Sequence, residues 1–298
     1  MRFLFVDRIL DLSSSVGSVR GIKHVTHEDF YLSADEEGRL RFMPALIGET
    51  LGQLTAWAVM SHHHFCLRPV AGIVASAQLY RSAYVGETIV LESWIDALDD
   101  KAVEYHGEAR VGSELVFRLE GALGPLLPME DFIDPILVRR QFAEINRPGE
   151  WPLLQTPHLF CNSEDKTPYA LHFDHITHHE PGIRIEATKL VTRAAPYFPD
   201  HFPYKPVLPL TVLLECKMNL AKTFLAHAGL ECDYQIHALR RIKMSDFVYP
   251  GDEVHCTVTV KHHSKEELIL QYRSEVAHKR ICVLEILLCA QPTGEAHE

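Results

Sequence analysis

A histidine and a glutamate stand at the two ends of one unusual stretch, HFPYKPVLPLTVLLE, which runs from His201 to Glu215. A neutral imidazole accepts protons well near physiological pH, and a carboxyl group whose pKa is raised by burial donates them. The two residues therefore suit acid and base chemistry. A histidine in a loop or a glutamate on a helix flank is, however, usually an ordinary solvated side chain, so the case depends on the elements that position them.

The prolines of this stretch predict where a helix begins. Pro203, Pro206 and Pro209 fix φ and disfavour helix in the residue before each of them, so the helix can begin only at about Leu210. Apolar residues then cover nearly every face of it: Val212, Leu213, Leu214, Cys216, Met218, Leu220, Phe224 and Leu225. A helix of this kind is buried, so Glu215 is expected to be either functional or paired.

The run DHFPYKPVLPLTVLLE resembles the GHFPxxPVMPGVLxxE signature of the FabZ/FabA family, the β-hydroxyacyl-acyl carrier protein dehydratases of the hotdog fold. His201 and Glu215 match the functional positions of that motif at the same separation. Two further stretches, FDHITHHEPGIRIEATKLVT and RRIKMSDFVYPGDE, are similar to strands of the family. The chain departs from the motif at Asp200, where the family has Gly, and at Pro209-Leu210, where it has Pro-Gly.

The first half of the chain is similar to the same family, which indicates an internal duplication. The runs FLFVDRIL, GIKHVTHEDFYL and AGIVASAQLYRSAYVGETIVLE follow the family's strands, and the register that aligns the two halves pairs Glu49 with Glu215. We therefore expect an α+β double hotdog, each half a long central helix wrapped by an antiparallel sheet. Residues 1–127 form the first hotdog, residues 128–167 a proline-rich linker with a short helix at 138–145, and residues 168–298 the second.

The two copies differ in the residues that carry chemistry. In the register that pairs Glu49 with Glu215, the position matching His201 is Asp35, so the first copy lacks the histidine. Its helix keeps Glu49 and, one turn later, Gln53, whereas the second helix has Asn219 at the glutamine position. Each copy has therefore retained a different part of the machinery.

In the family each active site takes its histidine from one hotdog and its acid from the other. Carried over to this chain, the resemblance implies one site with His201 as base, Glu49 as acid and Gln53 in support. It also implies a second site in which Asp35 faces Glu215. Two carboxylates without a base repel each other and cannot perform the reaction, so this second site is expected to be silent.

The resemblance also implies which residues contact the substrate. Phe202, Pro209 and Leu210 are expected to support or contact the substrate, and the amides near Leu210 are expected to hold the enolate-like charge on the thioester oxygen. Backbone N–H groups at a helix start supply both hydrogen bonds and the helix dipole for such a charge. The substrate would arrive on a phosphopantetheine arm, with no other cofactor.

The expected partner is an acyl carrier protein, which is characteristically acidic, and other synthase enzymes are further possible partners. Arg240, Arg241 and Lys243 lie on the strand before the Pro-Gly-Asp turn, where the family's carrier-docking positive charges tend to fall. The alternative for these three residues is an ordinary charged surface strand.

Composition limits the classes of function. The 298 residues are 47% hydrophobic and 23% charged, which suits a soluble globular protein of about two domains, and the net charge of -11 argues against nucleic acid as the main partner. We expect a cytoplasmic protein because no signal peptide or membrane span is evident and the seven cysteines occur singly. We expect no metal, because the consecutive side chains of His62, His63 and His64 cannot all face one ion on a helix.

Three functions stay open from the sequence. The first is dehydration of (3R)-hydroxyacyl thioesters on a carrier protein to trans-2-enoyl thioesters, in fatty acid, polyketide or polyene assembly. The second is another hotdog thioester enzyme, a thioesterase or an enoyl hydratase. The third is a non-catalytic protein that binds acyl chains or scaffolds a synthase.

Overall fold

Two helices of equal length form the centre of the molecule, which we describe from a computed structural model over residues 3–12, 17–26, 29–151, 171–191, 195–231 and 233–290. Helix α1 spans Pro44–His62 and helix α3 spans Leu210–Ala228. Pro44 is the first residue of α1 and Pro209 is the N-cap of α3, positions where the missing N–H costs no helical hydrogen bond. The prolines therefore set the start of α3 where the sequence predicts it.

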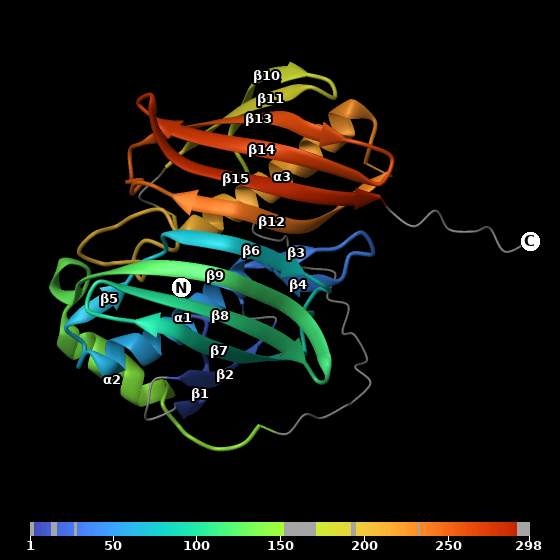
Figure 1. The fold of residues 1–298 in the computed structure, drawn as a ribbon. Helices are drawn as coiled ribbons and strands as arrows, with labels where there is room; N and C mark the ends of the chain where they lie inside the picture. Colours follow the sequence, from blue (N-terminus) through green and yellow to red (C-terminus); the bar gives the residue numbers. More distant parts are fainter. Residues whose placement is uncertain are drawn as a thin grey trace, which may run out of the picture.

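One antiparallel sheet wraps both helices (Figure 1). Its strands follow the order β1-β2-β7-β8-β9-β6-β12-β15-β14-β13-β11-β10. The first half contributes β1 (Arg8–Leu12), β2 (Ser18–His24), β6 (Ile73–Leu79), β7 (Thr88–Leu98), β8 (Ala102–Val111) and β9 (Glu114–Pro128). The second half contributes β10 (His175–Glu180), β11 (Arg184–Leu190), β12 (Tyr234–Met244), β13 (Glu253–His263), β14 (Glu267–Val276) and β15 (Lys279–Ala290). A short β5 (Leu67–Pro69) pairs with β9, and β3 (Leu32–Ala34) pairs with β4 (Leu40–Phe42) in a separate hairpin.

The two halves repeat each other element by element. The register that pairs Glu49 with Glu215 also aligns both ends of α1 with the corresponding ends of α3. Local contacts repeat as well: a carboxylate oxygen of Asp7 accepts the N–H of His24 at 2.6 Å, and one of Asp174 accepts the N–H of Leu190 at 2.6 Å. Each half is one long helix wrapped by antiparallel strands, which confirms the predicted α+β double hotdog.

The halves join through β6 and β12 at the middle of the sheet. These strands pair antiparallel, with Gln78 opposite Ala238 and Ser76 opposite Arg240, so the sheet passes from one hotdog to the other without a break. The helices α1 and α3 also contact each other beneath this seam. Buried side chains of both halves belong to one continuous hydrophobic core, so the two hotdogs pack as one body.

The region between the halves carries a helix, α2, which spans Pro135–Ile145 and begins earlier than the predicted 138–145. The Asp134 side chain caps it by accepting the N–H of Ile136 at 2.8 Å, and the proline occupies the first helical position. A 3₁₀ turn at Met129–Asp131 precedes it. Residues 152–170 lie outside the described residues, so the predicted linker and its boundaries stay a prediction.

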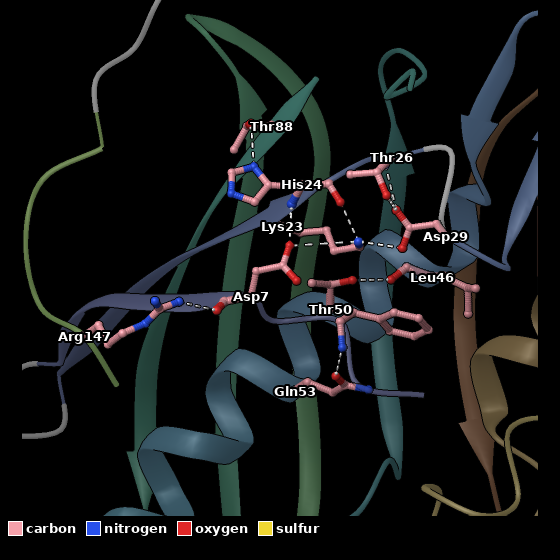
Figure 2. Close-up of polar contacts among 11 residues, drawn as sticks. Asp7, Lys23, His24, Thr26, Asp29, Leu46, Thr50, Gln53, Thr88 and Arg147 are labelled. Atoms are coloured by element: carbon pink, nitrogen blue, oxygen red, sulfur yellow. Dashed lines mark hydrogen bonds and ion pairs between the residues drawn. The ribbon is translucent and has the colours of Figure 1, made fainter. Parts of the chain in front are cut away.

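A buried polar network ties β2 to the segments beside it (Figure 2). The Lys23 side chain is only 4% exposed, and its ammonium group bonds a carboxylate oxygen of Asp29 at 2.7 Å and the carbonyl oxygen of His24 at 2.5 Å. Asp7 lies 4.0 Å from the same group. A buried cation is tolerated only when it is paired in this way, so the network holds the Asp29 carboxylate beside β2.

Candidate active site

The first cavity lies between the two hotdogs and has a volume of about 120 Å³. Glu49 and Gln53 reach it from α1, Arg68 from β5, and His201 and Phe202 from the loop before α3. The structure therefore brings the histidine of one half and the glutamate of the other into one site.

The imidazole of His201 has a defined tautomer. Its Nδ1 lies 2.9 Å from the carbonyl oxygen of Val207. A carbonyl oxygen only accepts, so Nδ1 carries the proton and Nε2 keeps a free lone pair. Burial and the positive charge of Arg68 together lower the pKa of His201 to about 3, although the hydrogen bond to Val207 opposes them. The ring is therefore neutral near pH 7, as a proton acceptor must be.

The loop around His201 is held by aromatic contacts and by the first half of the chain. Phe202 adopts a φ of 62°, a left-handed conformation that is uncommon for a residue other than glycine, and its ring stacks on the imidazole at 4.2 Å. Phe132 meets the same phenyl ring edge-on at 4.7 Å. The carboxylate of Asp200 accepts the N–H of Phe3 at 2.8 Å. The aspartate that replaces the family's glycine therefore anchors the loop to the other hotdog.

Glu49 is held by a partner at each oxygen. Its Oε1 accepts from the Gln53 amide at 3.0 Å, and its Oε2 accepts from the Thr211 hydroxyl of α3 at 2.8 Å. Burial raises the pKa of Glu49, against the lowering effects of these two hydrogen bonds and of Arg68. A carboxyl group in this state can carry a proton and donate it.

Gln53 joins Glu49 to the N-terminal segment. Its amide oxygen accepts the N–H of Phe5 at 2.9 Å, and its amide nitrogen donates to the carbonyl oxygen of Phe3 at 3.1 Å (Figure 2 shows its amide turned towards this segment). Because Phe3 also bonds Asp200, this segment links the acid to the loop that carries the histidine.

The start of α3 lines the same cavity. Leu210 is the first residue of the helix and Pro209 is its buried N-cap. The N–H of Leu210 is one of the first four of α3, which have no acceptor inside the helix and carry the positive end of its dipole. This arrangement can stabilise a negatively charged oxygen.

A second cavity, of about 90 Å³ and with mostly apolar walls, continues from the first. It shares Glu49, Gly52 and Leu210 with the active-site cavity and extends along Gly48 to Phe117 and Leu119 of β9. A Cβ atom on Gly48 would lie 3.3 Å from the Phe117 ring, and one on Gly52 would lie 3.3 Å from the Tyr105 hydroxyl. The glycines of α1 thus let the Phe117 ring and the Tyr105 hydroxyl pack close to the helix, and a larger residue at either position would displace them.

Glu215 lies in a third cavity, of about 480 Å³. Its Oε2 accepts the N–H of Ala45 at 3.1 Å, at the position equivalent to the Thr211 contact of Glu49. The amide of Asn219 donates to the carbonyl oxygen of Leu171 at 2.9 Å. These contacts repeat those of Glu49 and Gln53, but the position equivalent to His201 holds an aspartate.

The structure differs from the prediction at that aspartate, Asp35, which does not line the cavity of Glu215. Its carboxylate accepts hydrogen bonds from the Arg39 guanidinium and the Tyr84 hydroxyl, both at 2.9 Å. The hydrogen bonds from Arg39 and Tyr84 lower the pKa of Asp35, although burial opposes them. These partners hold the carboxylate, and the neighbouring Glu36 lines the cavity instead.

The predicted docking residues are exposed on β12, beside the seam between the halves. Arg241 has a φ of 53° and reaches Glu285 at 3.4 Å, so one of the three charges is partly neutralised. Lys243 directly precedes Met244, which lines the active-site cavity. The positions suit docking near the cavity, and their role stays a prediction.

Sequence reasoning missed two residues of the site. Arg68 belongs to the three-residue strand β5, which no motif marks, and its guanidinium lies over the Phe202 ring at 4.4 Å. Its Nε is buried and has no hydrogen-bond partner among the described residues. Thr211 lies inside the motif stretch, but its contact with Glu49 appears only when the halves are assembled.

Other groups of the described chain stay outside this chemistry. Burial raises the pKa of Cys216 to about 12, so its thiol stays protonated, as a core cysteine does. Within the described ranges, no cluster of three or more His, Cys, Asp or Glu residues could hold a metal ion. The same residues contain no helix that is both long and apolar enough to cross a membrane.

Comparison with known proteins gives sequence relatives and fold relatives. Residues 176–284 match the family model "ApeI-like: ApeI dehydratase". The 3-hydroxyacyl-[acyl-carrier-protein] dehydratase FabZ of Cupriavidus metallidurans is 34% identical over 126 residues, which cover 41% of this chain and 83% of that protein. The FabZ of Shewanella baltica is 28% identical over 125 residues, 40% of this chain and 80% of that protein.

Two solved structures match almost the whole chain in fold. One is the dehydratase domain of the polyketide PpsC from Mycobacterium tuberculosis, with a TM-score of 0.54, 8% identity and coverage of 97% of this chain and 98% of that one. The other is a putative oleoyl thioesterase from Lactobacillus plantarum, with a TM-score of 0.54, 14% identity and coverage of 95% and 100%. At these identities both show the fold alone, whereas the sequence match to FabZ covers most of a FabZ chain. With its histidine and glutamate brought into one cavity by two hotdogs, this chain belongs to the FabZ-like dehydratase family.

Proposed function

We propose that this protein removes water from (3R)-hydroxyacyl thioesters carried on an acyl carrier protein and yields trans-2-enoyl thioesters. The observation that carries the proposal is that a neutral His201 and a Glu49 whose pKa is raised by burial line one cavity made by both halves. An elimination of this kind needs one base and one acid at the same substrate.

His201 acts as the base. Its Nε2 lone pair accepts the proton from C2 of the substrate, while the hydrogen bond from Nδ1 to Val207 holds the ring in place. The electrons of the broken C–H bond move towards the thioester oxygen. The N–H of Leu210 and the dipole of α3 stabilise the charge that develops there.

Glu49 acts as the acid. It gives its proton to the hydroxyl on C3, the C–O bond breaks, and water leaves as the C2–C3 double bond forms. Gln53 and Thr211 orient the carboxyl group during this step. Transfer of the proton from the imidazolium to the Glu49 carboxylate, through the released water, then restores both groups.

The sequence relatives favour dehydration over thioester hydrolysis. The FabZ proteins match in sequence over most of their length, while the thioesterase structures match only in fold. The Nε2 lone pair and the carboxyl group also supply the two proton transfers that dehydration requires without an added water nucleophile. A carrier protein and other synthase enzymes follow from the same proposal as partners.

The test is loss of water from a 3-hydroxyacyl-carrier protein, followed by mass spectrometry. His201→Ala and Glu49→Gln are each expected to lower the rate by about 10² to 10⁴, the usual contribution of a general acid or base. Glu215→Gln is the matched control, because it changes the equivalent carboxyl of the other helix, and it should keep the parent rate. Loss of activity in Glu215→Gln with retention in Glu49→Gln would overturn the pairing. A parent protein inert towards carrier and CoA thioesters of all chain lengths would instead favour a non-catalytic acyl-binding role.

A further inference from the structure

The cavity of Glu215 is the counterpart of the active-site cavity, but its lining has changed. In the register of the duplication Glu215 corresponds to Glu49, Met218 to Gly52 and Tyr234 to Arg68, and all of these residues line their respective cavities. The volume is about 480 Å³, against about 120 Å³ for the active site. The second site therefore lacks the histidine base but still encloses a cavity.

Two cations replace apolar residues in this cavity. Arg41 stands where the active site has Val207, and Lys222 stands where it has Ala56. Among the described residues, no carboxylate lies within 4.0 Å of either cation, whereas Arg81 in the same cavity is paired with Glu87 at 3.0 Å. The cavity thus offers two positive charges that no ion pair within the described chain neutralises.

The hydrogen bonds of these cations are also incomplete. Arg41 donates from Nη1 to the Ser82 hydroxyl at 2.7 Å, but its Nε is buried without a partner among the described residues. Among the residues that the structure describes, the Lys222 ammonium group donates only to the amide oxygen of Asn219, at 3.4 Å. A buried donor without an acceptor costs free energy, and an anionic ligand that accepts from the guanidinium would offset that cost.

The acids of the cavity do not oppose an anion. Glu36 and Glu231 are exposed at its rim. Glu215 is only 3% exposed, and burial raises its pKa although the Ala45 hydrogen bond and the charges of Lys222 and Arg41 oppose the rise, so the group can hold a proton and donate a hydrogen bond. The interior therefore presents donors to a ligand.

An apolar path leads away from these donors. The cavity of about 90 Å³ described above shares Pro44, Leu79, Met218, Ile236 and His237 with the cavity of Glu215. An alkyl chain whose head lies between the cations can extend along these residues. We propose that the silent site binds a fatty carboxylate, its head group at Arg41 and Lys222 and its chain in the apolar cavity.

Isothermal titration of the full chain with decanoate and with 1-decanol tests the proposal without any turnover. Decanoate is expected to bind at least about tenfold more tightly, the order of one charge-assisted hydrogen bond. The double variant Arg41→Gln, Lys222→Gln should lose that preference. Arg68→Gln is the matched control, because it removes the guanidinium from the other cavity, and it should retain the preference.

Glu215→Gln provides a second check, since glutamine cannot ionise and keeps an oxygen that can accept from Ala45. It should bind decanoate at pH 8 at least as tightly as the parent protein does. Equal affinity of the parent for decanoate and 1-decanol would overturn the proposal whether or not any variant folds. The proposal would also be overturned if the parent showed no measurable decanoate binding, or if Arg68→Gln alone lost the preference for decanoate. A dehydratase that is active but shows no such preference would sink this inference and leave the proposed function standing.

Discussion

Arg68 acts on both proton-transferring residues through its charge, which lowers the pKa of His201 and the pKa of Glu49. Activity requires a neutral His201 and a protonated Glu49. The rate therefore decreases at pH values below the pKa of His201, which is about 3, and at pH values above the raised pKa of Glu49.

Arg68→Gln removes this charge, so both pKa values should rise and both limbs of the pH profile should move to higher pH. The alkaline limb of kcat/KM, measured for the parent and the variant, checks the shift. Arg41→Gln is the control, since it changes the cavity of Glu215. A lower rate with an unmoved alkaline limb would mean that Arg68 has only a structural role.

Glu215 should make stability depend on pH. Burial raises its folded-state pKa above the ordinary value of 4.5, so between these two pKa values the folded chain binds more protons than the unfolded chain. Stability from this group is present below pH 4.5 and is lost as the pH rises through the folded-state pKa. Glu215→Gln should therefore raise Tm relative to the parent at pH 8, with the gain disappearing near pH 4.

Thermal unfolding at the two pH values measures this difference. Glu104→Gln, at an exposed position on β8, is the control and should leave Tm nearly unchanged at both. A gain from Glu215→Gln that is the same at pH 4 and pH 8 would contradict the assignment.

At the scale of elements, α1 limits the length of the acyl chain. Gly48 and Gly52 lie one turn apart and line the apolar cavity, whereas α3 carries Leu214 and Met218 at the equivalent positions. Gly48→Leu should fill the space near Phe117. Because each methylene excluded from an apolar pocket is worth about 1–3 kcal/mol, the rate on a long 3-hydroxyacyl chain should fall at least about tenfold more than the rate on a four-carbon chain.

Rates on the two substrates, measured side by side, check this expectation. Ala56→Leu, about two turns after Gly48 on α1, is the comparison variant: Ala56 lines the active-site cavity but not the apolar cavity, so the rates on the two substrates should fall by similar factors. Equal losses on short and long chains in Gly48→Leu would show that the second cavity does not hold the chain.

The elements that the sequence predicts well are those with strong local signals. Three prolines determine the start of α3, and the double hotdog follows from the repeated pattern of helix and strands. The length of β9, which runs without a break from Glu114 to Pro128, could not be predicted. Gly121, at a φ of 56°, passes Ala75 where a Cβ atom would lie 2.7 Å away, and a sequence pattern reads that glycine as a break.

The residues of the candidate site divide in the same way, into those that a local motif marks and those that only the assembled structure reveals. His201 and Glu49 could be predicted because motif positions transfer between the copies. The orientation of Asp35 could not, because alignment gives a position and not the direction of a side chain, and Arg39 and Tyr84 decide that direction. Arg68 was missed because its role depends on contacts across the assembled halves.

At the scale of the whole molecule, the proposed function requires an acidic protein to receive a carrier protein that is expected to be acidic as well. The net charge is -11, so docking depends on a local positive surface, and Arg240 and Lys243 are exposed beside the seam. Arg240→Glu with Lys243→Glu should raise KM for carrier-bound substrate by at least about tenfold and leave the rate on a small thioester mimic unchanged, since steering acts on the carrier.

The two substrates are compared at low and at high salt, because screening weakens such steering. Lys265→Glu, on the exposed turn between β13 and β14, is a control for charge reversal away from β12. Equal effects on both substrates would remove the docking assignment.

The unbroken pairing of β6 with β12 has a consequence for how the protein behaves on dilution. In a homodimer with shared sites, the active fraction falls once the concentration drops below the dissociation constant of the pair. Here a single translation product supplies both unlike halves in a fixed ratio of one to one, and the covalent chain keeps them together. Turnover per chain should therefore stay constant however far the protein is diluted, and no exchange of halves between molecules can produce an inactive pair.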